Sequence, residues 1–149
     1  MAQGSVGAGT GTINFELKGG IGSSSREVEV AGQKYTVGVM LQTNYGWRDQ
    51  FTFLGKPLGK LIQKPKAKSI REGSCIGILA TDAPLSPHTL RRLAVRMGLG
   101  LARTGSHAHH ASGEIMMAFS TARETVFDLK HDGDYYAPFF WAAIEATEE

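Results

Sequence analysis

The sequence predicts a mixed α+β domain, because strand-like and helix-like apolar patterns follow one another along the chain. The strand-like segments either alternate apolar and polar residues or are short and rich in β-forming residues. The helix-like segments repeat apolar side chains every three or four residues. The expected strands lie at 12–18, 26–32, 34–43, 75–81 and 114–121, and the expected helices at 86–105 and 134–149. At 149 residues the chain can bury a core, and we expect a single domain over 1–149.

The first half of the chain is predicted to be mostly β-structure. Residues 12–18 alternate apolar and polar side chains, as a half-buried strand does. The segments 26–32 and 34–43 are joined by a short turn, which predicts a hairpin. Because 34–43 is nearly all apolar, we expect a central strand that is buried on both faces. Residues 47–59 predict a short strand and a Gly-Pro turn.

The second half is predicted to alternate strands and helices. The run 75–81 is expected to be another buried strand. In the helix that follows, Ser86 is expected to be the N-cap and Pro87 the first helical residue. Gly105 is expected to end this helix. The last helix is aromatic, with Pro138 near its start.

A long basic segment separates the two halves. A loop of this length inside a compact domain often has a function. We interpret residues 55–73 as an exposed, solvated loop, while clustered basic side chains can also form an anion-binding patch. The charged residues of the segment are Lys56, Lys60, Lys64, Lys66, Lys68, Arg71 and Glu72.

Composition excludes several classes of protein. The net charge is +2, so neither nucleic-acid nor membrane affinity is expected. A single cysteine excludes an internal disulfide and fits a reducing compartment. No stretch approaches the roughly 18 apolar residues of a membrane helix. The first residues lack the basic and apolar regions of a signal peptide, and we therefore expect a cytoplasmic protein.

Two motifs invite a cofactor or metal interpretation. The glycine run "GSVGAGTGTINF" lacks the GK[ST] ending of a phosphate-binding loop, and no strand precedes it. We interpret it as a tight loop. His107, His109 and His110 could bind a metal together with Glu114, but neighbouring histidines on a loop do not easily converge on one ion. We favour a polar loop, in which His107 or His110 could line a pocket, and we expect no metal and no cofactor.

Ser74 is the most informative residue for function. A hydroxyl that follows a glycine at a strand start, behind an exposed loop, suits self-cleavage of the Gly73–Ser74 bond. Gly73 has no side chain to block attack on its carbonyl. Cleavage would give Ser74 a free α-amine with a pKa of about 7.7–8, suited to general-base catalysis. Cys75 could also be a nucleophile, but we interpret it as an apolar strand residue.

Four stretches together resemble one peptidase family, that of L-aminopeptidase/D-Ala-esterase-amidase and the β-peptidyl aminopeptidases. They are "GTINFELKGGIGSSSR", "YTVGVMLQTNYG", "GSCIGILATDAPLSPHTLRRLAVRMGLGLARTGS" and "SGEIMMAFST". The resemblance implies an αββα sandwich like that of N-terminal-nucleophile hydrolases. It implies self-cleavage between Gly73 and Ser74, into an α-like portion 1–73 and a β-like portion 74–149. It also implies a homo-oligomer that cleaves small peptides, amides or esters.

The resemblance also assigns roles to individual residues. Ser74 matches the nucleophile of the family, and Asn44 matches an asparagine of the oxyanion hole. Ser112 and Glu114 match a serine and an acid that position the nucleophile and its amine. Family members have a longer region before this segment, which carries an active-site tyrosine, and they continue beyond it. The chain is therefore expected to be an internal fragment.

Two other functions stay open at this point. The first is acyl transfer by a related fold, as in ornithine acetyltransferases, although these use a threonine nucleophile where this chain has Ser74. The second is a catalytically incomplete fragment that only folds or assembles with other chains. The L-, D- or β-amino acyl specificity does not follow from the sequence.

Overall fold

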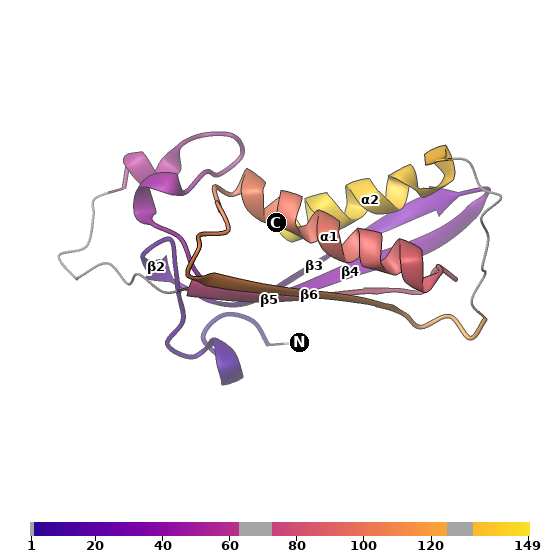
Figure 1. The fold of residues 1–149 in the computed structure, drawn as a ribbon, viewed down its shortest axis with the longest axis horizontal. Helices are drawn as coiled ribbons and strands as arrows, with labels where there is room; N and C mark the ends of the chain where they lie inside the picture. The colour runs from indigo at the N-terminus through magenta and orange to yellow at the C-terminus, as the bar shows by residue number, and fades with distance from the viewer. Residues whose placement is uncertain (1, 63–72, 125–132) are drawn as a thin grey trace. The chain divides into compact units, whose positions relative to one another are not determined.

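The computed structural model describes residues 2–62, 73–124 and 133–149 (Figure 1). Its helices and strands confirm the α+β prediction. A small antiparallel pair joins β1 and β2, and β3, β4, β5 and β6 form a four-stranded sheet in that order. The elements are η1 Gly7–Gly9, β1 Ile13–Asn14, β2 Leu17–Lys18, β3 Gly20–Val30, β4 Gln33–Asn44, η2 Arg48–Gln50, η3 Leu58–Lys60, β5 Gly73–Thr81, α1 Pro87–Arg103, β6 Ser112–Ser120 and α2 Gly133–Glu148.

Packing divides the chain into two compact units. The strands of the four-stranded sheet contribute residues to both of them. Each unit also contains segments from both sides of the Gly73–Ser74 bond. The first unit comprises Met1–Gly22, Leu41–Ile76 and Leu101–Ile115, and the second comprises Ser23–Met40, Gly77–Gly100 and Met116–Glu149.

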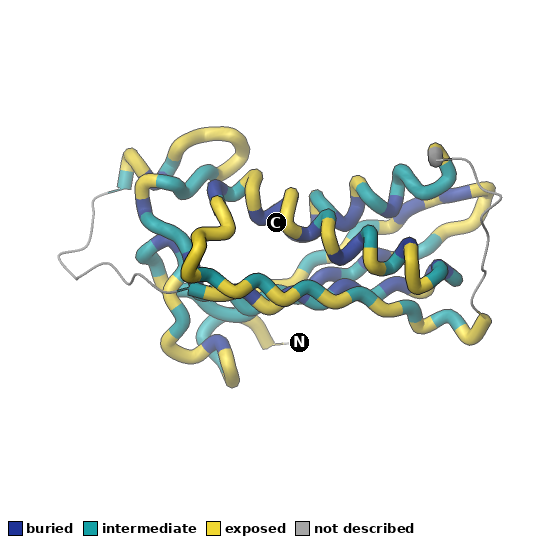
Figure 2. Tube along the Cα trace, viewed as in Figure 1, coloured by how far each residue is buried: buried dark blue, intermediate teal, exposed yellow. Residues whose placement is uncertain are grey.

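In the second unit, helices cover one face of the sheet (Figure 1). Buried and exposed positions alternate along the strands beneath them (Figure 2). The prediction that 34–43 is buried on both faces is therefore wrong. Val37 and Val39 on one face are buried, whereas Gly38 and Met40 on the other face are only half-buried. Both helices contribute to this core, whose buried members include Val28, Val30, Leu79, Leu93, Met97, Phe139, Ala142 and Ala143.

In the first unit, the predicted strand 12–18 is instead a tight hairpin. Its turn residues Phe15 and Glu16 have φ values of 50° and 57°, the left-handed region that non-glycine residues rarely adopt. Tertiary contacts override the alternating pattern. The Phe15 ring is 2% exposed and packs 5.3 Å from the Tyr45 ring and 5.1 Å from the Phe51 ring.

The predicted strand in 47–59 is also wrong. Short 3₁₀ turns η2 and η3 occupy this segment, and its one β-type contact among the described residues is an isolated bridge between Phe53 and Lys56. The Gln50 side chain favours the turn, since its Oε1 accepts the Trp47 N–H at 3.1 Å. Residues 55–62 are mostly exposed, and the rest of the predicted basic loop up to residue 72 lies outside the described residues.

The predicted turns and helix ends are confirmed. Ala31 and Gly32, both with positive φ, close the hairpin between β3 and β4. Ser86 caps α1, because its Oγ accepts the Thr89 N–H at 3.2 Å. Gly105, with a φ of 100°, ends the helix. Among the described residues, neither α1 nor α2 is long and apolar enough to cross a membrane.

Two glycines of α1 provide a matched test of packing in the second unit. A Cβ at residue 100 would lie 2.5 Å from the Ile144 carbonyl oxygen and 2.6 Å from the Thr147 Cβ, whereas a Cβ at residue 98 would meet open space. We expect Gly100→Ala to lower the free energy of unfolding by about 1–3 kcal/mol through overpacking. Gly98→Ala should raise it by roughly 0.5–1 kcal/mol. Denaturant unfolding of both variants checks this, and equal effects would contradict the packing.

Candidate active site

The site is centred on Gly73, the first residue of β5. A Cβ at this position would lie 2.9 Å from the Asn44 carbonyl oxygen and 3.1 Å from both the Cα and the Cβ of Tyr45. A side chain at residue 73 would displace backbone atoms, which shift only at a cost, so the close approach favours glycine here. The bond that follows Gly73 is therefore held against the end of β4.

The neighbouring strands also place Asn44 and Ser74 across from one another. Gly38 lies beside Ala80, and Gly73 lies beside Tyr45, so β4 and β5 run antiparallel. In this register Ser74 lies opposite Asn44. Opposed residues project their side chains from the same face of a sheet. The exposed Ser74 and the Asn44 amide therefore share one face.

A hydrogen bond fixes the orientation of the Asn44 amide. Its Oδ1 accepts the backbone N–H of Ile13 at 2.9 Å. A backbone N–H can only donate, so the oxygen and not the nitrogen of this side chain must face β1. The NH₂ end of Asn44 is then the end that can donate to a substrate oxygen.

Ser112 and Glu114 form a second pair. The Ser112 hydroxyl donates to Glu114 Oε1 at 2.5 Å, and both residues are half-buried on one face of β6. Glu114 lies close enough to Tyr45 and Cys75 for its charge to raise the pKa of both. Because side chains alternate along a strand, Ser74 projects from the face of β5 opposite to Cys75. Asn44 and Ser74 thus share one face of the sheet, and the hydrogen-bonded pair of Ser112 and Glu114 lies on the opposite face.

Burial controls the acidity of the groups around Glu114. Desolvation, assisted by the Glu114 charge, raises the pKa of the Cys75 thiol to about 12. Desolvation is also the main cause that raises the pKa of Tyr45 to about 12. Cys75 is 1% exposed and stays a thiol at neutral pH. It therefore packs as an apolar strand residue, and it lacks the thiolate that a nucleophile needs.

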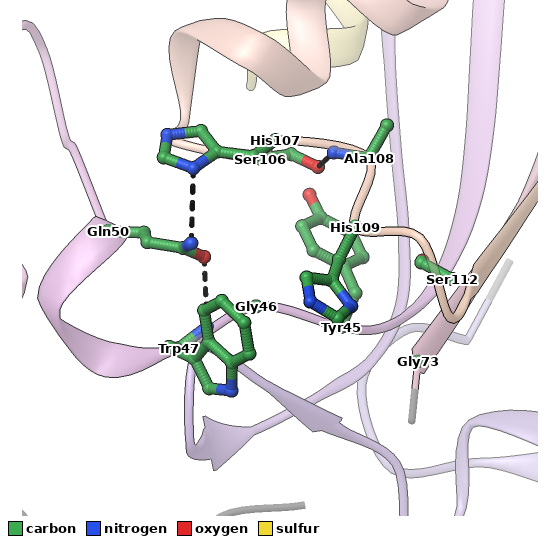
Figure 3. Close-up of a pocket in the computed structure, with 10 residues that line it drawn as sticks. All are labelled: Tyr45, Gly46, Trp47, Gln50, Gly73, Ser106, His107, Ala108, His109 and Ser112. Carbon is green, nitrogen blue, oxygen red and sulfur yellow. Dashed lines mark hydrogen bonds between the residues drawn. The ribbon is translucent and has the colours of Figure 1, made fainter. Parts of the chain in front are cut away.

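A pocket lies beside Gly73 (Figure 3). It is partly open to solvent, and its cavity volume is about 30 Å³. The sequence did not indicate its aromatic and amide wall, because 47–59 was predicted to contain a short strand, whereas Arg48–Gln50 form a 3₁₀ turn. The lining residues are Tyr45, Gly46, Trp47, Gln50, Gly73, Ser106, His107, Ala108, His109 and Ser112.

Two of the three loop histidines line this pocket, and His110 does not. The Gln50 side chain connects the walls, since its Oε1 takes the Trp47 N–H and its Nε2 lies 3.2 Å from His107 Nδ1 (Figure 3). The Gln50 nitrogen can only donate, so His107 Nδ1 is the acceptor of this hydrogen bond. The His109 ring packs edge-on against Trp47, with 4.7 Å between centroids.

The described residues hold no group of three or more metal-binding side chains. The loop histidines contact Gln50, Trp47 and the backbone instead; His109 Nδ1, for example, accepts the Ala111 N–H at 3.3 Å. These contacts agree with the interpretation of 106–112 as a polar loop beside a pocket.

Comparison with known proteins gives one consistent result. The model of peptidase family S58 matches residues 1–149. A β-peptidyl aminopeptidase, BapA, from Sphingosinicella microcystinivorans is 37% identical, over all of this chain and 43% of its own length. A homologous BapA from Sphingosinicella xenopeptidilytica is 38% identical, with 42% of its length covered. The chain thus spans less than half the length of these relatives.

Solved structures share the fold. The L-aminopeptidase D-Ala-esterase/amidase from Ochrobactrum anthropi, described as a serine aminopeptidase with a variant of the Ntn-hydrolase fold, matches with a TM-score of 0.86 and 37% identity. The match covers 99% of this chain and 43% of that chain. The PH0078 protein from Pyrococcus horikoshii gives a TM-score of 0.87 and 44% identity, with the same coverage. The predicted relation to Ntn hydrolases is confirmed.

The raised pKa of Cys75 predicts that stability falls in alkaline solution. Above pH 9, the ordinary thiol value, the unfolded chain loses a proton that the folded chain keeps. The free energy of unfolding then falls as pH rises toward 12, by up to about 1.4 kcal/mol per pH unit. Tyr45 adds to the fall above pH 10.

Cys75→Ala isolates this effect, because between pH 9 and 10 Tyr45 contributes little. The variant should flatten the pH dependence of denaturant unfolding in that interval, whatever its absolute stability. An unchanged slope would contradict the thiol assignment.

Proposed function

The chain belongs to peptidase family S58, and we propose that it carries the nucleophile of a serine aminopeptidase that cuts itself between Gly73 and Ser74. The observation that carries the proposal is the register of β4 and β5. It sets the Asn44 amide on the same face as the Ser74 hydroxyl, beside a position where the close approach of β4 favours glycine. A hydroxyl, a strand-end carbonyl and an amide donor are the groups that acyl transfer needs.

In the self-cleavage step, Ser74 Oγ attacks the Gly73 carbonyl carbon. The new Oγ–C bond gives a tetrahedral oxyanion. Its collapse breaks the Gly73 C–Ser74 N bond, and the proton from the hydroxyl passes to the nitrogen, which becomes the Ser74 amine. Water then hydrolyses the ester to a Gly73 carboxylate and a free Ser74 hydroxyl. The Asn44 NH₂ group, oriented by Ile13, stabilises the oxyanion that forms at the carbonyl oxygen.

The same groups serve an external substrate after cleavage. Ser74 Oγ attacks the carbonyl of the substrate's N-terminal residue to give an acyl-Ser74 intermediate, and the leaving group is an amine or an alcohol. The Ser74 α-amine has a pKa near ambient pH and passes the proton from the hydroxyl to the leaving group. Glu114 favours the charged form of a nearby amine, and Ser112 holds its carboxylate through the hydrogen bond between them.

The names of the relatives support a proposal for the substrate class. Their names describe aminopeptidases of L-residues and of β-peptides, and an esterase and amidase of D-alanine derivatives. We therefore assign short peptides, amides or esters with a free amino terminus to the complete protein. The pocket beside Gly73 would take the groups next to the scissile bond.

The two portions are expected to stay together after cleavage. Residues 1–73 and 74–149 both supply segments to each compact unit, so separating them would expose the cores of both. Assembly with further chains is also expected, because β6 exposes Ile115, Met117 and Phe119 by 48–59%.

Mass spectrometry of the purified chain tests self-cleavage. We expect the fragments 1–73 and 74–149 on denaturation, one peak on native size exclusion, and an intact chain for Ser74→Ala. Ser25→Ala, which changes an exposed strand serine, is the matched control and should cleave normally. Cleavage at another bond, or equal cleavage of Ser74→Ala, would contradict the proposal.

A second variant tests the oxyanion donor. Asn44→Ala removes the NH₂ group and should slow cleavage by about 10²–10³-fold, as the loss of an oxyanion donor does. The rate is measured by the appearance of fragment 74–149 after refolding. A rate equal to that of the wild-type chain would remove Asn44 from the mechanism.

A further inference from the structure

The oriented amide of Asn44 depends on the small hairpin of β1 and β2. Its acceptor oxygen is held by the Ile13 N–H, and Ile13 is the first residue of β1. Each strand of this hairpin is two residues long, and an isolated two-stranded hairpin is marginal in water. The position of the Ile13 N–H must therefore be set by contacts from outside the hairpin.

The turn of the hairpin is intrinsically unfavourable. Phe15 and Glu16 both have positive φ, which costs roughly 1 kcal/mol or more for each non-glycine residue. Neither residue is Gly, Asn or Asp, the types that tolerate this geometry. A backbone of this kind persists only where its surroundings hold it in place.

Arg48 provides that contact. Its side chain is buried, with 4% of the residue exposed. Its Nε donates to the Phe15 carbonyl oxygen at 2.9 Å, and its Nη2 donates to the Glu16 carbonyl oxygen. One planar guanidinium thus holds the carbonyls of both strained residues, a geometry that the single ammonium of lysine cannot reproduce.

The other contacts of the turn lead back to the end of β4. The Phe15 N–H donates to the Tyr45 carbonyl oxygen at 2.7 Å, and the Phe15 ring packs against the Tyr45 ring. A Cβ at Gly46 would lie 2.5 Å from the Phe15 ring. The turn is therefore fixed against the residues that directly follow Asn44.

From these contacts we infer that Arg48 is a positioning residue for the oxyanion hole. It fixes the strained Phe15–Glu16 turn, the turn fixes the Ile13 N–H, and this N–H orients the Asn44 amide toward the reacting carbonyl. The inference rests on the proposed function, since it assigns Asn44 the oxyanion. Arg48 itself touches no reacting atom.

A double-mutant cycle separates this role from general stabilisation. Arg48→Lys keeps the charge but loses the paired contact to the turn, and we expect it to slow cleavage at Gly73–Ser74 by about 10–100-fold. In the Asn44→Ala background, Arg48→Lys should cause no further slowing, because the group that it positions is gone. Arg91→Lys, at an exposed arginine of α1, is the matched control and should cleave at the wild-type rate.

Hydrogen exchange provides a readout that needs no cleavage. In the intact Ser74→Ala chain, Arg48→Lys should speed exchange of the Ile13 amide at least as much as Asn44→Ala does, while amides of α1 keep their protection. Unchanged exchange at Ile13 would overturn the inference, and loss of protection throughout α1 would show a structural role for Arg48 instead.

The outcomes distinguish the inference from the proposed function. If Asn44→Ala cleaves at the wild-type rate, the oxyanion assignment fails, and the positioning role fails with it. If Asn44→Ala slows cleavage but Arg48→Lys slows it equally in both backgrounds, the oxyanion assignment stands and the positioning role is overturned.

Discussion

The site depends on one steric constraint, the contact between residue 73 and the end of β4. The Cβ of a side chain at this position would lie 2.9 Å from the Asn44 carbonyl oxygen and 3.1 Å from the Tyr45 Cα, which is closer than ordinary van der Waals contact. With glycine there, the first residue of β5 can lie against the end of β4. The register that results places Ser74 opposite Asn44 and Gly73 beside the pocket wall. A larger residue would push β5 away and separate these groups.

The groups around Gly73 divide between the two faces of β5. On one face lie the exposed Ser74 hydroxyl, which is the proposed nucleophile, and the oriented Asn44 amide, which is the proposed oxyanion donor. On the other face, the Ser112–Glu114 pair lies near Tyr45 and Cys75, whose raised pKa values keep both neutral. The Ser74 backbone nitrogen lies in the backbone of β5, between its two faces. Cleavage would convert this nitrogen into an amine at the new start of the strand.

The sequence was sufficient to predict those elements whose structure is decided by periodicity and helix caps. It was insufficient to predict those that are decided by tertiary contacts. The helix α1 with its Ser86 cap, the hairpin at Ala31–Gly32 and strand β6 all follow from local pattern. The turn at Phe15–Glu16 does not, because Arg48 and Tyr45 stabilise a backbone that its own residues disfavour. Ser74, Asn44, Ser112 and Glu114 could be named from motif resemblance, but the pairing of these residues, the Gln50–His107 contact and the role of Ile13 required coordinates.

Trapping the ester with hydroxylamine tests the central claim most directly. If Ser74 Oγ attacks the Gly73 carbonyl, an ester joins the two portions before hydrolysis, and hydroxylamine should intercept it. Mass spectrometry should then find fragment 1–73 with a hydroxamate at Gly73, formed faster than hydrolysis alone forms the carboxylate. Cleavage that hydroxylamine neither accelerates nor diverts, or a chain that stays intact under folding conditions, would contradict the account.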